Sequence, residues 1–330
     1  MHKPILYHKN LDQLTYEEKI LLEENKKSIQ DFVEHSSAIS NVNHSTRNAH
    51  AKTYAVLGGV FKIDKNIPEH IKEILDRKEY AVTVRLSNAH LKITKEDVPA
   101  YGFAIKIKDE ASRTIANFPL VNFPVFPIRS VSHFLKLFTA ANRFFISKRK
   151  GFFPLLKQVV SVAPSFISPE FLSHTFNFLK RKNDFLLSFN YYSVGAYRFG
   201  NEIIKIKIKP KNVSKNFGKD LPVKEAVNRF CTENEFSAEV FLQFCFNEKD
   251  QPIQDLRKKW RNSPYVKVGE IFIPENSLNK NLCENELLSF NPFESAEMFF
   301  PVGKIQKLRE ETYKVSLQTR KRINKLLKYQ

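Results

Sequence analysis

Three residues near the end of the chain have types and a spacing that suit a metal-binding phenolate. Arg309 and Tyr313 stand four residues apart, and Arg320 follows the tyrosine by seven residues. The run Lys304–Leu327 contains no Gly or Pro and predicts one helix, on which these side chains share a face. A guanidinium one turn away favours the ionised phenol, and a phenolate is an anionic ligand suited to ferric iron. An ion-paired surface helix is the alternative interpretation, because Lys and Arg make up 53 of the 330 residues.

Four segments nearer the beginning of the chain carry further residues able to do chemistry. They are an R-x-x-H-A-K segment at 47–52, a V-R-x-S segment at 84–87, a G-F-A-x-K segment at 102–106 and an N-x-P-x-F segment at 122–126. Followed by the R-x-x-x-Y segment at 309–313, this ordered set resembles the haem catalases from about residue 44 to about residue 325. The order of the segments is what makes the resemblance specific, because each segment alone is short. The length is closer to that of the small catalase-related haem proteins than to that of full-size catalases.

The resemblance implies a cofactor and the residues that hold and use it. The cofactor is haem, expected to be of the b type, with Tyr313 as the iron ligand and Arg309 beside its phenol. His50 stands where the family has the histidine that exchanges a proton with peroxide, a task that suits an imidazole near neutral pH. Ser87 stands where the family has the serine that hydrogen-bonds this imidazole and fixes its tautomer.

The resemblance is less complete at a second polar residue. Beside the histidine, the catalases have an asparagine that donates a hydrogen bond to the peroxide. Asn122 is the candidate, but an ungapped alignment on Pro124 puts Val121 at the catalytic position. Either the loop shifts by one residue or this hydrogen-bond donor is missing. In the second case peroxide cleavage slows, because one contact to the developing charge is lost.

Further positions match residues that surround the haem of the family. Haem has two propionate carboxylates, which pair well with the forked donors of arginine, and Arg47, Arg85 and Arg320 match the arginines that face them. Phe126 and Phe134 match aromatic residues of the pocket wall. Exposed basic residues and ordinary core packing are the alternative interpretations. For Arg85, which lies in an apolar strand pattern, a buried anion is the better explanation, because an unpaired buried charge is costly.

The pattern of the whole chain predicts an α+β fold. We expect an N-terminal helical arm over residues 1–40 and a single catalase-like domain over residues 41–330. Two groups of strands, separated by a proline-interrupted helical segment at 132–182 and followed by a final helix, suit a closed antiparallel β-barrel with helices outside it. The first group belongs to a β-rich region that ends at about Arg129. The expected strands cover 80–86, 101–107, 114–119, 185–192, 196–209, 236–246 and 265–273, and the expected helix of the arm covers 15–34.

Composition narrows the range of partners and compartments. The formal net charge is +18, but the lysines are spread along the whole chain, so we attribute the charge to solubility and compositional bias and expect no nucleic-acid partner. Cys231, Cys245 and Cys283 have no metal-ligand spacing and are interpreted as reduced thiols. No apolar run resembles a secretory signal or reaches eighteen residues, and we expect a cytoplasmic protein. A homodimer is a further expectation.

Three functions remain as hypotheses. The first is a haem hydroperoxidase that decomposes hydrogen peroxide or uses it to oxidise an organic donor. The second is a haem enzyme that transforms fatty-acid hydroperoxides, of the allene oxide synthase or lyase type. Ala49 argues against it, because that branch commonly has threonine there. The apolar segment 144–156 with its flanking basic residues argues for it, because such a segment suits a lipid-entry element or peripheral contact with an anionic membrane; a solvated helical insertion is the alternative interpretation of this segment. The third is a catalytically idle haem-binding protein, suggested by Thr53 in place of a usual glycine.

Overall fold

The centre of the molecule is a closed β-barrel. The structure, a computed structural model, describes residues 3–128, 130–166 and 169–327, so Arg129 lies outside the described residues. Within them ten strands form one antiparallel sheet in the order β10-β6-β7-β5-β4-β3-β2-β1-β9-β8, and an additional β7–β8 pairing closes eight of the strands into a barrel. The predicted α+β class and closed barrel are thus confirmed. The strands are β1 Thr53–Ile63, β2 Glu79–Asn88, β3 Tyr101–Lys108, β4 Thr114–Val121, β5 Tyr191–Tyr192, β6 Ala196–Phe199, β7 Glu202–Lys211, β8 Phe236–Phe244, β9 Tyr265–Ile273 and β10 Pro301–Val302.

Strands β2, β3 and β4 form a wall with two different faces, because successive residues of a strand point to opposite sides. Leu86, Phe103 and Leu120 are cross-strand neighbours and belong to the main hydrophobic core. The two adjacent rows point to the other face of the wall. They consist of Arg85, Ala104 and Pro119, and of Ser87, Gly102 and Val121.

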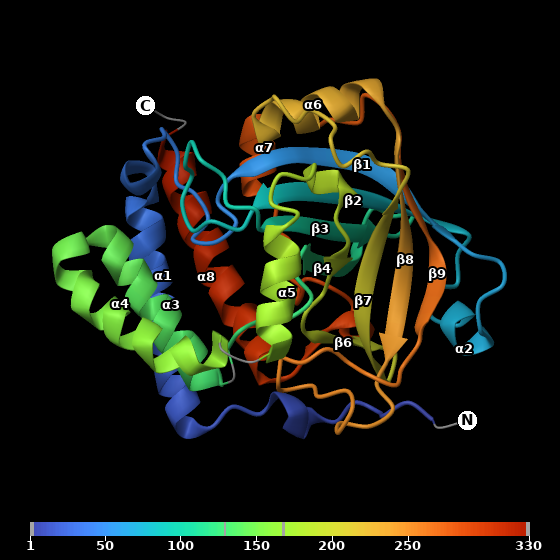
Figure 1. Cartoon of the computed structure of the whole chain (residues 1–330), viewed down its shortest axis with the longest axis horizontal. Helices are drawn as coiled ribbons and strands as arrows, with labels where there is room; N and C mark the ends of the chain where they lie inside the picture. Colours follow the sequence, from blue (N-terminus) through green and yellow to red (C-terminus); the bar gives the residue numbers. More distant parts are fainter. Residues whose placement is uncertain (1–2, 129, 167–168, 328–330) are drawn as a thin grey trace.

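Three long helices stand beside this wall (Figure 1). They are α1 Tyr16–Ser40, α3 Val131–Ile146 and α8 Lys304–Leu327, and α1 packs against both of the others. α1 begins with a capping box, in which the Thr15 hydroxyl accepts a hydrogen bond from the Glu18 amide and the Glu18 carboxylate accepts one from the Thr15 amide. α8 has the bounds that the sequence predicts.

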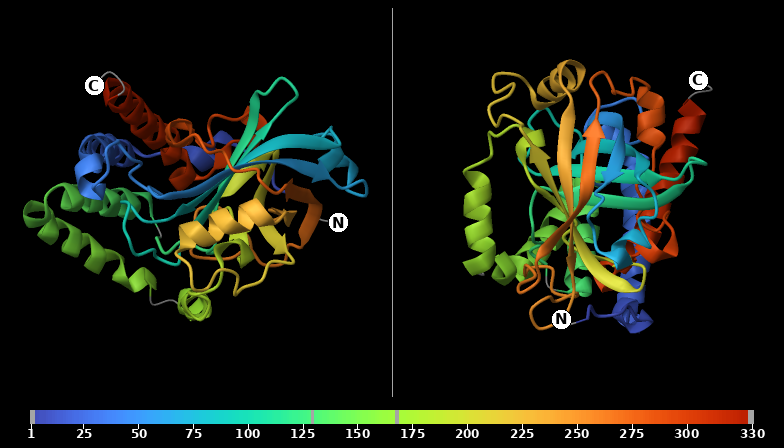
Figure 2. Two further views of the ribbon diagram at one scale, coloured as in Figure 1. Left: turned by 90° about the horizontal axis from the view of Figure 1, so that it is seen from above. Right: turned by 90° about the vertical axis from the view of Figure 1, so that its right-hand side faces the viewer.

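The shorter helices are α2 Glu69–Lys72, α4 Lys148–Val162, α5 Pro169–Leu179, α6 Val223–Glu233 and α7 Leu282–Leu287, with 3-10 turns at Lys9–Asp12, Ala163–Phe166, Leu186–Ser188 and Glu297–Phe299. Of these helices, α6 packs on strand β1 and α4 packs on α3, away from the barrel (Figure 2). In the part of the chain that the structure describes, no helix combines the length and apolar character needed to cross a bilayer.

Two expected strands differ from the observed structure. In 185–192 only Tyr191–Tyr192 is a strand, and Leu186–Ser188 is a 3-10 turn that the Tyr191 hydroxyl stabilises by donating to the Leu186 carbonyl at 2.8 Å. The expected strand 196–209 is two strands, because Gly200 (φ +63°) and Asn201 form a tight loop between the paired ends of β6 and β7. Short α6 and α7 are not predicted by the sequence pattern.

Candidate functional site

A cavity of about 330 Å³ lies between the outer face of the barrel wall and helices α3 and α8. Its volume lies within the range of cofactor and small-molecule sites. The lining is mainly apolar and aromatic, and polar side chains are placed at a few points. The apolar part includes Val121, Phe126, Phe134, Phe138, Leu288, Phe290 and Leu308.

The two predicted aromatic residues belong to a connected group of rings on one wall. The ring centres of Phe126 and Phe134 lie 5.9 Å apart, and Phe134 stacks on Phe138 at 4.5 Å. Such contacts fix the rings in place. This wall therefore offers a preformed surface to a flat apolar ligand.

His50 stands on the barrel side of the cavity in a backbone conformation that is unusual for a residue other than glycine. Its φ angle is +50°, in the left-handed region, where strain commonly coincides with function. Arg85 holds this conformation by donating to the His50 carbonyl at 2.6 Å. The His50 ring Nδ1 lies 3.1 Å from the Ser87 hydroxyl, so the predicted pair is formed.

Gly102 leaves the space that the His50–Ser87 pair occupies. A Cβ atom at Gly102 would lie 2.6 Å from both Nδ1 of His50 and Oγ of Ser87. The glycine of the G-F-A-x-K segment is thus required by the close approach of the imidazole to the wall, because any side chain there would displace the pair.

The electrostatics of the cavity keep His50 neutral. Burial, together with three neighbouring guanidiniums of which Arg85 acts most strongly, lowers the pKa of His50 from 6.5 to about 3. His50 is half-buried and lines the cavity. At neutral pH the imidazole is therefore an uncharged base that faces the cavity.

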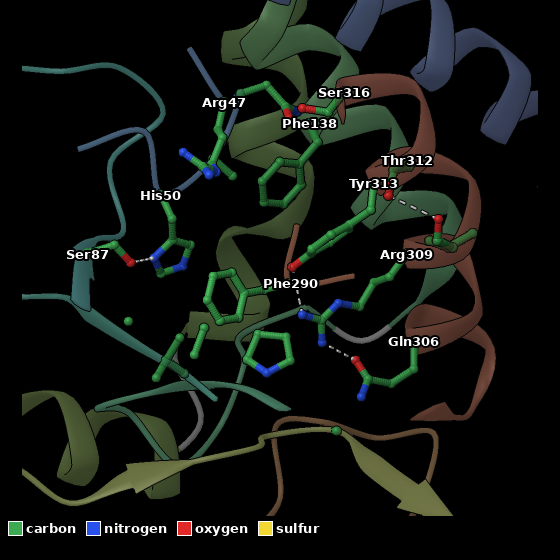
Figure 3. Close-up of a pocket in the computed structure, with 18 of the residues that line it drawn as sticks. Arg47, His50, Ser87, Phe138, Phe290, Gln306, Arg309, Thr312, Tyr313 and Ser316 are labelled. Carbon is green, nitrogen blue, oxygen red and sulfur yellow. Dashed lines mark hydrogen bonds between the residues drawn. The ribbon is translucent and has the colours of Figure 1, made fainter. Parts of the chain in front are cut away.

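The opposite side of the cavity is formed by one stripe of α8. Arg309 donates to the Tyr313 hydroxyl at 2.8 Å and to the Gln306 side-chain carbonyl at 3.0 Å. Burial lowers the pKa of Arg309, but the charge interactions and hydrogen bonds with Tyr313 and Tyr197 outweigh this and raise it above the usual value. Arg309 is therefore a permanent cation against the phenol. Figure 3 shows Tyr313 and His50 pointing toward each other from opposite walls.

The three remaining predicted arginines gather at one edge of the cavity around the carboxylate of Glu286. Arg47 forms an ion pair with it at 2.5 Å. Arg85 donates to the Thr53 hydroxyl at 2.9 Å, and that hydroxyl donates to Glu286 at 2.9 Å. Arg320 donates to the Glu286 backbone carbonyl. All three arginines are buried.

This cluster has more positive than negative charge. Burial and the neighbouring Arg47 lower the pKa of Arg85 to about 9, and the same two causes lower that of Arg320 well below its usual value. Burial raises the pKa of Glu286, but the arginines lower it more, so the carboxylate is ionised. Nε of Arg320 is buried without a hydrogen-bond partner among the described residues, and no acidic side chain of the described chain lines the cavity. At this edge of the cavity a single carboxylate, that of Glu286, therefore faces three guanidiniums.

Asn122 is not among the residues that line the cavity. It is buried, its side-chain carbonyl accepts from the Tyr101 amide at 2.8 Å, and its side-chain nitrogen donates to the Pro99 carbonyl at 3.1 Å. Val121 lines the cavity instead, in the same cross-strand row as Ser87 and Gly102. Of the two alignments that the sequence allows, the one with valine in the cavity thus matches the structure.

Other residues of the site carry little signal in the sequence. Glu286 is one of two glutamates in a short helix. Tyr197 contacts Arg309 only through the fold, whereas Gln306 lies one turn before Arg309 on α8. Cys231 and Cys245 are buried free thiols away from the cavity, and burial raises the pKa of each to about 12. The side chain of Cys283 lies outside the described residues. No three His, Cys, Asp or Glu side chains of the described chain lie close enough together to hold a metal ion.

Comparison with solved structures places this fold with that of catalases. A bacterial catalase aligns with a TM-score of 0.63 and 16% identity over 88% of this chain and 60% of its own. A fungal catalase aligns with a TM-score of 0.60 and 17% identity over 97% of this chain and 65% of its own. Catalase A from Saccharomyces cerevisiae aligns with a TM-score of 0.56 and 18% identity over 97% of this chain and 67% of its own.

The likeness covers the fold and only part of the length of those proteins. The chain spans 60% and 65% of the first two catalases. No protein-family model and no curated protein matches the sequence. The catalase-like fold is therefore shown by the structure, and the chemistry must be argued from the residues of the cavity.

Proposed function

We propose that this protein is a haem-dependent hydroperoxidase. The observation that carries the proposal is the opposition of two hydrogen-bonded pairs, His50–Ser87 and Tyr313–Arg309, across one apolar cavity. The three crowded arginines at the edge of the cavity support it, because they share one carboxylate, that of Glu286, and Nε of Arg320 is buried without a hydrogen-bond partner among the described residues.

The residues present fit a b-type haem. Tyr313 would ligate the iron, and Arg309, which donates to the Tyr313 oxygen at 2.8 Å, would stabilise the negative charge of the ligand. Arg47, Arg85 and Arg320 would face the two propionates, and Nε of Arg320 would gain the partner it lacks. Phe126, Phe134 and Phe138 would pack against the porphyrin.

The protein itself would supply proton transfer. Bound haem supplies an iron that exchanges electrons with a peroxide. With its Nδ1–H donated to Ser87, His50 would keep a free lone pair on Nε2 toward the cavity. Nε2 would accept a proton from one peroxide oxygen and return it to the leaving oxygen. The lowered pKa keeps this base available at neutral and mildly acidic pH.

The position of Val121 favours a second candidate, the transformation of organic hydroperoxides. A catalytic amide would polarise a small peroxide, whereas valine offers an apolar contact beside His50, and most of the cavity wall is apolar. This arrangement suits an alkyl or fatty-acid hydroperoxide. Ala49 lines the cavity beside His50, where that branch commonly has threonine, and this favours hydrogen peroxide.

The haem-loaded protein and its His50→Ala variant test the proposal. We expect both to keep haem, because His50 lies opposite the ligating residue, and we expect only the first to turn over peroxide. Oxygen evolution from hydrogen peroxide identifies the first candidate. Loss of a fatty-acid hydroperoxide without oxygen identifies the second. Equal rates in both proteins would refute the acid–base role of His50.

A further inference from the structure

Large apolar side chains that contact solvent are concentrated in two helices, α4 and α5. Of thirteen strongly exposed large hydrophobic residues of the described chain, eight come from residues 152–179. They are Phe152, Phe153, Leu156, Val159, Val160, Leu172, Phe176 and Leu179, and Phe153 is 75% exposed. A patch of this kind marks a surface that binds something apolar.

α4 presents apolar residues on the side where an ordinary surface helix is polar. Its inner side includes Gly151 and Val162, which are buried, and a Cβ atom at Gly151 would lie 2.3 Å from Cα of Phe144 in α3. α4 therefore packs closely on α3 through a small residue. Its exposed apolar residues, at 152, 153, 156, 159 and 160, have the spacing of a single outer face.

α5 continues this arrangement. Its inner residues Phe171 and Phe178 pack against Phe123, with ring centres 5.6 and 5.3 Å apart. Its outer stripe consists of Leu172, Phe176 and Leu179. Both helices lie on the outer surface on the same side of the molecule (Figures 1 and 2). We call these eight outward side chains of α4 and α5 the docking face.

The charge around the docking face is strongly positive. Residues 143–183 contain eight basic residues and one acidic residue. Lys148, Arg149 and Lys150 are exposed at the start of α4 and form no ion pair in the described part of the chain. Nζ of Lys180 lies 4.4 Å from the ring centre of Phe176, so a cation borders the apolar stripe directly.

We propose that the docking face binds the surface of an anionic phospholipid bilayer. Phenylalanine and leucine on one face, with lysine and arginine at its border, are typical of helices that lie in the membrane interface. The basic residues would lie beside anionic head groups, which attract them. A protein partner would have to be both acidic and apolar over two separate helices, so the charge and the shape fit lipid better. The proposal does not depend on the cavity or on haem.

Co-sedimentation with vesicles tests this proposal on the full chain. Vesicles of phosphatidylcholine alone are compared with vesicles that also contain phosphatidylserine, each at low and high salt. We expect binding to the anionic vesicles that weakens with salt. The double variant Phe153→Gln, Phe176→Gln should weaken it by about tenfold or more, and so should Lys148→Glu, Lys150→Glu.

Matched control variants distinguish binding through the docking face from binding caused by the general net charge of +18. Tyr16 is 80% exposed in α1, and Lys219 and Lys224 are exposed outside the docking face. Tyr16→Gln and the double variant Lys219→Glu, Lys224→Glu should bind like the wild type. Thermal melts of all variants establish that each is folded. Absence of binding to anionic vesicles, or equal losses in the control variants, would overturn the proposal.

A fluorescent probe measures insertion directly. Trp260 is the single tryptophan and is buried. Phe153→Trp adds a tryptophan on the docking face, and its emission should shift to shorter wavelength when anionic vesicles are added. Tyr16→Trp is the control, for which we expect no shift. An unshifted Phe153→Trp spectrum with bound protein would show that the face does not enter the interface and would overturn the proposal.

Discussion

We predict that replacing Gly102 by alanine impairs the proposed proton transfer by His50 and leaves the proposed binding of haem intact. The new methyl carbon would lie 2.6 Å from the His50 ring and from the Ser87 hydroxyl. Carbon atoms rest at roughly 3.5 Å from such neighbours, so the pair must move by about 0.9 Å. A misplacement near 1 Å can cost about 100-fold in rate, and the overpacking should lower the free energy of unfolding by about 1–3 kcal/mol.

The assay compares Gly102→Ala with Gly58→Ala, because a Cβ atom at Gly58 meets nothing within 4 Å. Peroxide turnover per bound haem and urea unfolding are measured for both. We expect turnover to fall by about 100-fold in Gly102→Ala, whereas Gly58→Ala should keep the wild-type rate. The absorption spectrum should be nearly unchanged in both variants, because Tyr313 and Arg309 lie on the other wall. Wild-type turnover in a folded Gly102→Ala protein would refute the assigned role of the His50–Ser87 pair.

Three further predictions concern the charged residues and the barrel side of the cavity, where His50 and Val121 lie. The pKa of His50 is about 3 in the folded chain and near 6.5 in the unfolded chain, so the unfolded chain takes up the proton first as the pH falls. From about pH 6 to pH 4 the free energy of unfolding of the wild type should therefore fall relative to that of His50→Gln by about 1.4 kcal/mol per pH unit. Urea unfolding at each pH measures this, and a difference that does not vary with pH would contradict it. Glu286→Gln leaves Arg47, Arg85 and Arg320 without their shared carboxylate and should lower the free energy of unfolding by on the order of 3 kcal/mol; a variant as stable as the wild type would show that the cluster needs no anion. Val121→Asn should raise hydrogen-peroxide turnover by about tenfold or more by adding a hydrogen-bond donor, as measured with an oxygen electrode, and an unchanged rate would show that this contact does not limit the reaction.

Much of the fold follows from regular patterns in the sequence. The helix Lys304–Leu327 is uninterrupted by Gly or Pro and has the predicted bounds. The strand Tyr265–Ile273 likewise has its predicted bounds. The run 185–192 is wrongly predicted as one strand, because Leu187, Phe189 and Tyr191 alternate with the polar Ser188 and Asn190 as in a half-buried strand. What decides its conformation is the tertiary contact of the Tyr191 hydroxyl with Leu186.

The residues of the site differ in how far the sequence predicts them. The i,i+4 spacing of Arg309 and Tyr313 predicts their contact, because it is local to one helix. The meeting of His50 with Ser87 requires the register of β1, β2 and β3, and only the resemblance to a family supplies it. The choice between Val121 and Asn122 depends on where β4 ends, which a one-residue shift reverses. The role of Glu286 could not be predicted from the sequence, because its partners come from three distant segments.

The central claim is that Tyr313 ligates a haem iron, and titration of the protein with haem, followed by absorption spectroscopy, tests it most directly. We predict that the wild type gives a Soret band that saturates at one haem per chain. Tyr313→Phe should lose haem affinity or show a shifted band while it keeps the wild-type fold. A wild-type protein that forms no Soret band, or a Tyr313→Phe spectrum and affinity identical to those of the wild type, would contradict the claim.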